Sequence, residues 1–228
     1  GTGVWSIDCL TGDSAEPTSI NTEGSSTVLS TSEGSRLHMK DPVAFRTTDG
    51  PTQIVFCSHP FSWSSSNTGL ASREASGGSF RLVSKSLLER GPSWDVACAR
   101  VTECLPLPQV GILESLPPLS LYFYDGAECL RPLDQNPKAA RRPRGYSCEE
   151  LGGLAWGFDD EFPKLRRISE DFPLFVSPHA TGCSRYASAS FLADGTLAAA
   201  WQQVAADGSQ PLVGHSLVAE EVTRILRV

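Results

Sequence analysis

The chain has 228 residues, of which 40% are hydrophobic and 20% are charged, values typical of a globular protein with a buried core. Its formal charge of -7 argues against nucleic acid as the main partner, because a phosphate-binding face needs clustered lysines and arginines. No apolar run of about 18 residues is present, so the sequence predicts no membrane-spanning helix.

The seven cysteines are widely spaced, and none forms a Cys-X-X-Cys pair. Small buried thiols in a reducing compartment are the expectation for such a pattern. Residues 1–10 lack the basic start and apolar middle of a signal peptide, so a cytoplasmic location is favoured. The four histidines show no metal-ligand spacing, and no dinucleotide fingerprint or phosphate-binding glycine loop is present. We therefore expect no metal and no cofactor.

Short β-type runs with turn residues between them extend along the whole chain, and no long segment keeps a helical period. Two runs open the chain, and three groups of four then follow. Within a group the first run is mainly apolar, the second resembles a central strand, the third carries a glycine, and the fourth is polar. In chain order the runs are 3–6 and 27–31; 41–46, 53–58, 69–72 and 80–85; 95–100, 119–124, 153–156 and 164–169; and 183–191, 196–202, 214–217 and 222–228. The last run has a helical alternative, since residues 219–222 favour helix.

Four strands per unit, with polarity rising from the first to the fourth, predict an all-β protein folded as a β-propeller. We expect one propeller domain over residues 1–228, with a partial first blade at 1–35 and blades at about 36–90, 91–172 and 173–228. The chain is then expected to begin inside a blade. A β-sandwich is the alternative, but it does not explain why the runs that open at Asp41 and Asp95 both close with arginine five residues later.

Functional residues of a propeller are expected at the starts of first strands and in the loops between second and third strands, which open on one face. Asp41 and Asp95 begin first strands, and Arg185 and Tyr186 begin another. The loops are 58–68, 126–152 and 205–213. The middle loop is long and rich in charge, which is costly unless it has a function; a solvated flap is the alternative. The predicted substrate-binding residues are His59, Trp63, Arg144, Tyr146, Glu149, His179, Arg185 and Tyr186.

Cleavage of a glycosidic bond needs two carboxyl groups, one as acid and one as base or nucleophile. A third carboxylate can raise the pKa of the acid by repulsion between like charges. Asp41, Asp95 and a loop glutamate would meet this need, with Glu128 as the first candidate for the acid and Glu149 as the second. The alternative role for each aspartate is a hydrogen-bond acceptor at a strand end.

Two short motifs resemble those of the five-bladed propeller glycoside hydrolases, the arabinanase, xylosidase and invertase-like enzymes. Residues 39–42, Met-Lys-Asp-Pro, resemble their Arg-Asp-Pro or Lys-Asp-Pro segment. Residues 126–129, Gly-Ala-Glu-Cys, resemble the segment that carries the acid in the invertase branch. The resemblance implies five blades in the complete protein, Asp41 as a transition-state stabiliser or tuner of the acid, and Glu128 as the acid. The chain departs from the family because it has no Asn-Asp-Pro nucleophile segment and because Glu128 follows a second strand.

Two other functions fit the same face. A propeller phosphorylase needs cationic residues around phosphate, and Arg141, Arg142, Arg144, His179 and Arg185 offer them. A non-catalytic propeller would bind a glycan or a protein through aromatic rings and amides, without three converging carboxylates. Carbohydrate is the predicted partner, and the sequence does not indicate an oligomeric state.

Overall fold

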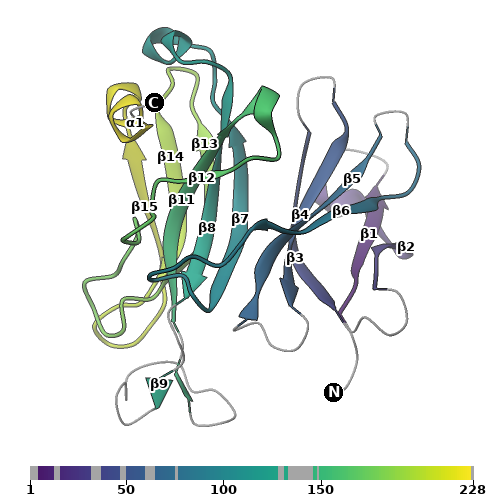
Figure 1. The fold of residues 1–228 in the computed structure, drawn as a ribbon, viewed down its shortest axis with the longest axis horizontal. Helices are drawn as coiled ribbons and strands as arrows, with labels where there is room; N and C mark the ends of the chain where they lie inside the picture. Colours follow the sequence, from purple (N-terminus) through teal and green to yellow (C-terminus); the bar gives the residue numbers. More distant parts are fainter. Residues whose placement is uncertain are drawn as a thin grey trace.

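The computed structural model describes residues 5–12, 16–31, 37–46, 50–59, 65–74, 77–127, 131–132, 146–147 and 149–226. Within these residues the chain is almost entirely β-structure (Figure 1), which confirms the predicted all-β class. The single described α-helix is α1 (Ala219–Leu226). None of the described helices has the length and apolar character needed to cross a membrane.

The strands form antiparallel sheets in which neighbours in sequence are neighbours in space. The N-terminal hairpin contains β1 (Ile7–Gly12) and β2 (Ile20–Leu29); the first sheet contains β3 (His38–Arg46), β4 (Thr52–His59), β5 (Asn67–Arg73) and β6 (Arg81–Leu88). The second sheet contains β7 (Cys98–Pro106), β8 (Leu119–Ala127), β11 (Glu150–Phe158) and β12 (Arg166–Arg167); the third contains β13 (Ser184–Phe191), β14 (Leu197–Gln203) and β15 (Leu212–Leu217). A short pair joins β9 (Arg131–Pro132) to β10 (Tyr146–Ser147), and 3-10 turns lie at Pro17–Ser19, Gly111–Ser115 and Asp159–Glu161.

The three predicted groups of runs coincide with the three sheets, and every run except the last overlaps one strand in the expected order. At 222–228 the helical alternative is correct, because α1 occupies the place after β15. Of the two opening runs, 27–31 overlaps β2, whereas the described part of 3–6 precedes β1. The predicted alignment of Asp41 with Asp95 is wrong: Asp41 lies inside β3, whereas Asp95 lies in a turn before β7 begins at Cys98.

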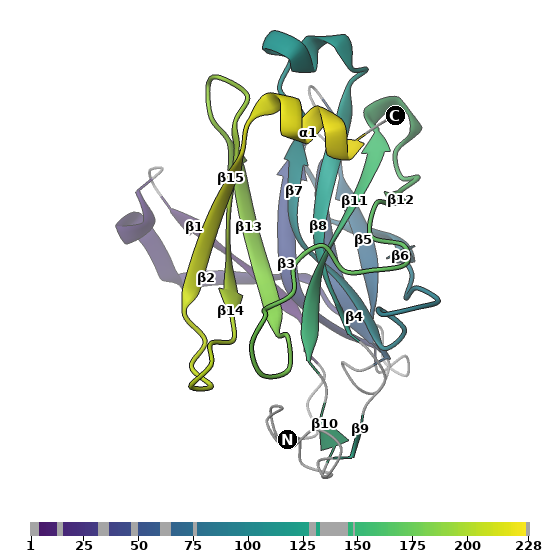
Figure 2. The same ribbon diagram turned by 90° about the vertical axis from the view of Figure 1, so that its left-hand side faces the viewer.

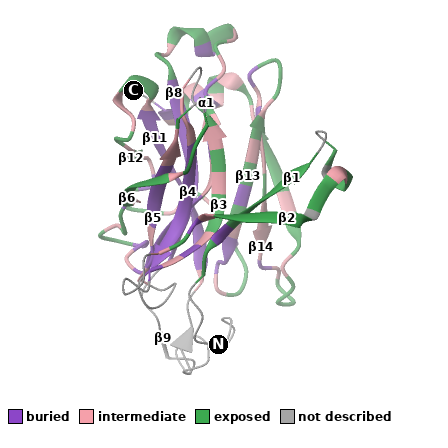
Figure 3. Cartoon of the chain, turned by 90° about the vertical axis from the view of Figure 1, so that its right-hand side faces the viewer, coloured by how far each residue is buried: buried purple, intermediate pink, exposed green. Residues whose placement is uncertain are grey.

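Three apolar layers separate the successive sheets, so the first and second sheets are packed on both faces. The hairpin meets the first sheet through Ile7, Leu29, Met39, Ile54 and Phe56; the first meets the second through Val55, Leu70, Val101, Tyr122 and Tyr124; and the second meets the third through Phe123, Leu154 and Leu197. Because consecutive strand residues point to opposite faces, β4 and β8 need apolar residues at nearly every position. Figure 3 shows this burial in β4 and β8 and the exposed surface of β2. Helix α1 closes the last layer with Val222 and Leu226 (Figure 2).

The glycine of the third run in a group has a packing reason in two of the three sheets. Gly69 of β5 pairs with Phe56 of β4, and Gly153 of β11 pairs with Tyr124 of β8. A Cβ atom at Gly69 would lie 2.5 Å from the Phe56 ring, and one at Gly153 would lie 2.5 Å from the Tyr124 ring. The aromatic ring of the second strand therefore lies over the backbone of the third strand.

Replacing Gly69 with alanine is expected to lower the free energy of unfolding by about 1–3 kcal/mol, because the buried Phe56 ring must move out of a packed layer. The matched control is Gly214→Ala in β15, where a Cβ atom would meet the Ala199 carbonyl oxygen at an ordinary 3.4 Å. Urea unfolding monitored by circular dichroism would measure both variants. Equal effects of the two substitutions would contradict the packing argument.

Candidate functional site

The first strands of the three sheets share a basic residue and an irregularity at the same register. Lys40 of β3 pairs with Cys57, Arg100 of β7 pairs with Asp125, and Arg185 of β13 pairs with Gln202. The pairing shifts directly after this residue in β3 and β13, between residues 40 and 43 and between 185 and 188, and one residue later in β7, between 101 and 103. A β-bulge re-aims side chains and is common beside active sites, so three bulges at one level mark this region.

Two residues of these bulges have left-handed backbone conformations. Asp41 has a φ of 52° and Tyr186 has a φ of 55°, a region that bulky residues seldom adopt. The Tyr186 amide donates hydrogen bonds to Asp125 Oδ1 at 3.0 Å and to Oδ2 at 3.2 Å. Asp125 therefore holds the β13 bulge in place from the second sheet.

Arg100 lies at the centre of a group of charged residues that we call the Arg100 cluster: Arg100, Asp41, Asp125, Glu150 and Arg185. The Arg100 guanidinium donates to Asp41 Oδ2 at 3.1 Å, to Asp125 Oδ2 at 2.6 Å and to Glu150 Oε1 at 3.4 Å. Glu150 accepts a further hydrogen bond from Arg185 Nη1 at 3.0 Å. Three carboxylates thus converge on one guanidinium, but only Asp41 belongs to the predicted set of Asp41, Asp95 and a loop glutamate.

The two glutamines beside Arg185 complete its surroundings. Arg185 Nε donates to Gln202 Oε1 at 2.8 Å, and Arg185 Nη2 donates to Gln210 Oε1 at 2.8 Å. Burial would lower the pKa of Arg185, but Glu150 outweighs it and the pKa is raised. Arg185 is therefore a fixed, fully charged part of the Arg100 cluster.

Burial controls the electrostatics of the cluster. Arg100 is only 2% exposed; burial alone would lower its pKa, but the charges of Asp125 and Glu150 outweigh burial and raise it. Burial raises the pKa of Asp125 to about 6, although Arg100 and the Tyr186 amide act in the opposite direction.

A small cavity of about 190 Å³ lies beside the cluster, and each first strand lines it with the three residues at its bulge: 41–43, 100–102 and 186–188. Among the three carboxylates, Asp41 is the one on this wall. Its side chain is 39% exposed, whereas those of Asp125 and Glu150 are 1% and 5% exposed. Tyr186 is 47% exposed, and its ring lies over the Arg100 guanidinium at 4.6 Å. The cavity can thus offer a ligand one carboxylate and one aromatic ring.

His59, a predicted substrate-binding residue, lies at the end of β4 and is buried. Its ring stacks on that of His38 with centroids 4.8 Å apart. Among the described residues, no hydrogen-bond partner meets its buried Nδ1 atom. Burial, followed by the nearby His38 and Lys40, lowers the pKa of His59 to about 4.

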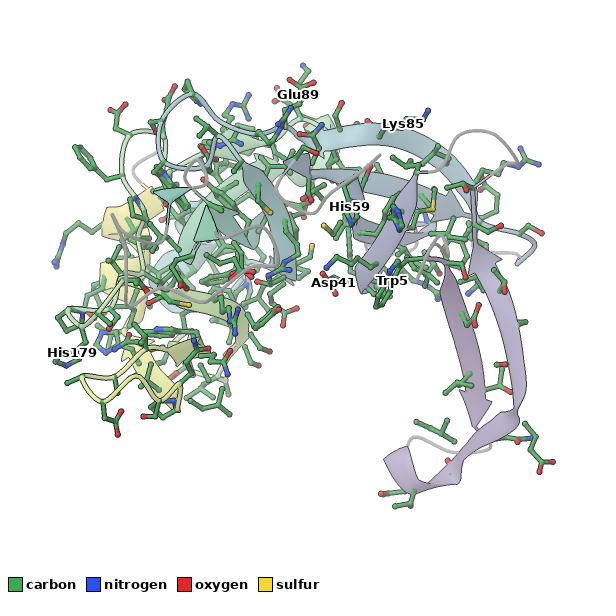
Figure 4. The ribbon with its side chains drawn as sticks, turned by 90° about the horizontal axis from the view of Figure 1, so that it is seen from below. Trp5, Asp41, His59, Lys85, Glu89 and His179 are labelled. Atoms are coloured by element: carbon green, nitrogen blue, oxygen red, sulfur yellow. The ribbon has the colours of Figure 1, made fainter. Side chains whose placement is uncertain are left out.

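The other predicted residues fall into two sets. Asp41 and Tyr186 come together at the cavity, and Arg185 lies behind it, paired with Glu150. Glu149 lies half-buried next to Glu150, close to Cys183. His179, in contrast, lies well away from Asp41 and His59 (Figure 4). Trp63, Glu128 and Arg144 are outside the described residues, as is the side chain of Tyr146 in β10.

Asp95 does not belong to the cluster. It is fully buried and accepts a hydrogen bond from Arg167 Nε at 2.9 Å. A Cβ atom at Gly126 would lie 2.6 Å from Asp95 Cβ. Asp95 therefore packs against the face of β8 that Gly126 presents, which is opposite to the face presented by Asp125.

Sequence reasoning missed three central residues of the site. In the sequence Arg100 stands out only as the end of a run, and Asp125 and Glu150 only as charges of the middle loop. A signal is present for Asp125, because it is the one charged residue in the otherwise apolar or small run of β8, LSLYFYDGA. A charge inside such a run indicates a buried partner.

Replacing Arg100 with methionine is expected to destabilise the chain by about 3–5 kcal/mol, because buried carboxylates lose their compensating charge. Adding Asp125→Leu to this variant should restore part of the stability, since it removes one of those carboxylates. Arg166→Met is the control: its partner Glu161 is on the surface, and such pairs contribute about 0–1 kcal/mol. Urea unfolding at pH 7 measures all three, and a cost below that of the control would contradict the buried-charge account.

His59 should make stability depend on pH between about 4 and 6.5. In this range the unfolded state, with a pKa near 6.5, binds a proton that the folded state, with a pKa of about 4, does not bind. The contribution of His59 to stability therefore falls as the pH falls across this window, by roughly 1–3 kcal/mol, whereas Asp125, with its pKa raised to about 6, contributes in the opposite direction. Compared with the unaltered chain, His59→Gln should remove the part of the slope due to His59, and His215→Gln, on the exposed β15, should leave the slope unchanged. An unchanged slope in His59→Gln would contradict the prediction.

No protein-family model and no curated protein matches this chain. Among solved structures, it is similar to one described as a complex of BT0996 and RGII, with a TM-score of 0.56 and 12% identity over 86% of this chain and 58% of that one. It is also similar to a protein of unknown function from Dyadobacter fermentans DSM 18053, with a TM-score of 0.55 and 12% identity over 82% and 53% of the two chains. A glycoside hydrolase aligns with a TM-score of 0.49 and 12% identity over 80% and 54%. The chain thus spans little more than half the length of these structures, and the likeness of the first two concerns the fold.

Proposed function

We propose that the chain forms blades of a β-propeller and carries a carbohydrate-active site at the Arg100 cluster. The first, second and third sheets are the proposed blades, with α1 in place of the outer strand of the last one and the N-terminal hairpin as part of another. Support comes from the sequential order of strands within each sheet and from the contacts of β7 with both β3 and β13. The single domain over 1–228 and the five-bladed ring stay predictions.

The observation that carries the function is the convergence of three carboxylates on Arg100 with Asp41 alone facing the cavity. Carboxylates are the catalytic groups of glycoside hydrolysis, and an aromatic ring such as Tyr186 offers an apolar surface together with a polar tip. The RGII named with one matched structure is rhamnogalacturonan II, a carbohydrate. These features favour a glycan as the ligand.

Asp41 is the proposed carboxylate that faces the reacting sugar. Lys40 Nζ at 3.4 Å and Arg100 Nη1 at 3.1 Å both contact Asp41 Oδ2, so we assign Oδ1 to the ligand. Held in this way, Asp41 would stabilise positive charge that develops on the sugar ring. Glu128 remains the first candidate for the acid and Glu149 the second. With Asp41 as the second carboxylate, hydrolysis of a glycosidic bond is the proposed reaction.

A second candidate is glycan binding without catalysis. The observation in its favour is that Asp125 and Glu150 are buried and paired with arginines, which leaves them as supports of the wall. For a phosphorylase, the Arg185 guanidinium already donates hydrogen bonds to Glu150, Gln202 and Gln210, and Arg141, Arg142 and Arg144 lie outside the described residues.

The test is hydrolysis of an aryl-glycoside panel by the chain, by Asp41→Asn and by the control Asp160→Asn, an exposed residue of the Asp159–Glu161 turn. Loss of a carboxylate that stabilises the transition state should lower kcat/KM by about 10²–10⁴-fold. The control should retain full activity, and urea unfolding should show both variants folded.

Binding of the same glycans, measured by calorimetry, separates the two candidates. Binding without turnover by the unaltered chain supports the non-catalytic function, and turnover that Asp41→Asn removes supports hydrolysis. Turnover that survives in Asp41→Asn would exclude the Arg100 cluster as the site.

A further inference from the structure

Trp5 is a large aromatic residue that the fold holds in place while leaving its side chain uncovered. It is 62% exposed. Its carbonyl oxygen accepts a hydrogen bond from the Met39 amide at 3.1 Å, and its amide donates to His38 Nδ1 at 3.3 Å. The backbone of Trp5 is therefore fixed at the start of β3.

The support for Trp5 is itself packed. His38 stacks on His59 with the two ring planes 16° apart, and His59 is buried. A backbone held on such a base loses little conformational freedom when a ligand binds, which favours affinity.

Trp5 lies close to the carboxylate of the proposed site. Met39, to which it is hydrogen-bonded, is two residues before Asp41 in the same strand. Seen from below in Figure 4, Trp5 and Asp41 project onto the same part of the first sheet, in line with this short separation along β3. Tyr186 lines the cavity beside Asp41 from the third sheet, so two exposed aromatic rings from distant parts of the chain accompany one carboxylate.

An uncovered indole forgoes the hydrophobic stabilisation that burial in the apolar layers would supply. The apolar core between the hairpin and the first sheet includes Ile7, which follows Trp5 by two residues in the sequence. The indole is nonetheless outside that core. Tryptophan is enriched where a partner covers its apolar face and meets its N–H group.

We propose that Trp5 is the stacking surface for the sugar that Asp41 contacts. The apolar C–H face of a pyranose ring lies on the indole, while hydroxyl groups of the sugar reach the Asp41 carboxylate. This inference rests on the proposed carbohydrate function. It adds a ligand class, namely pyranosides with one apolar face, and it adds Trp5 as a positioning residue outside the three sheets.

The experiment measures affinity for a pyranoside that the chain binds in the calorimetric panel. Trp5→Ala should weaken binding about tenfold or more, because stacking and buried apolar area are lost. Trp5→Phe should retain binding within about threefold, because a ring remains. The control Phe172→Ala removes a 79% exposed aromatic side chain between β12 and β13 and should leave affinity unchanged.

Oxidation of the unaltered chain with N-bromosuccinimide gives a second readout that needs no variant. Peptide mass mapping should show Trp5 oxidised in the free chain and protected by the bound pyranoside. Unchanged affinity in Trp5→Ala, or oxidation of Trp5 that the pyranoside does not slow, would overturn this inference alone. Failure of the unaltered chain to bind any glycan would overturn the proposed function and this inference with it.

Discussion

Arg100 places a full positive charge where only 2% of the residue reaches solvent, and removing a charge from water costs several kcal/mol. That cost is offset only if the surrounding carboxylates are correctly placed. Asp41 comes from the first sheet and Asp125 and Glu150 from the second, and Glu150 also binds Arg185 of the third. One series of charges therefore links all three sheets, so the positions of the sheets and the geometry of the site depend on each other.

The bulges turn this shared geometry into an asymmetric site. All three first strands change register after their basic residue, yet the residues with left-handed backbone are an aspartate in β3 and a tyrosine in β13. The repeated β-bulge thus brings segments of β3, β7 and β13 to one cavity. Because the side chains at these bulges differ, the cavity has the Asp41 carboxylate on one side and the Tyr186 ring on another. A bulge is well suited to this because it re-aims a side chain without ending the strand.

The strands were predictable from two features of the sequence. Packing on both faces requires apolar β-formers at nearly every position of β4 and β8, and the Phe56 ring leaves room only for a glycine at position 69. Asp41 stands out in the sequence because it opens a run that closes with arginine; the structure places it inside β3 at the cavity, and its role stays a prediction. Asp95 precedes an arginine by five residues, as Asp41 does. Its burial against β8, however, depends on tertiary contacts that this spacing does not reveal. Asp125 and Glu150 resembled loop charges because β8 and β11 extend beyond the predicted runs, and only the pairing of the two strands brings both residues into a sheet.

Asp41 differs from the other two carboxylates of the Arg100 cluster in its exposure and in its backbone conformation. Asp125 and Glu150 supply two negative charges for the two guanidinium groups of Arg100 and Arg185, and Asp41 adds a third charge that also pairs with Lys40 at 3.4 Å. Asp41 is a third carboxylate, it is the exposed one, and its left-handed backbone carries strain of roughly 1–3 kcal/mol. Burial of the arginines does not require it at that place. A strained, partly exposed carboxylate on a cavity wall is what the proposed function requires, and under that proposal the buried members of the cluster serve to hold it in position.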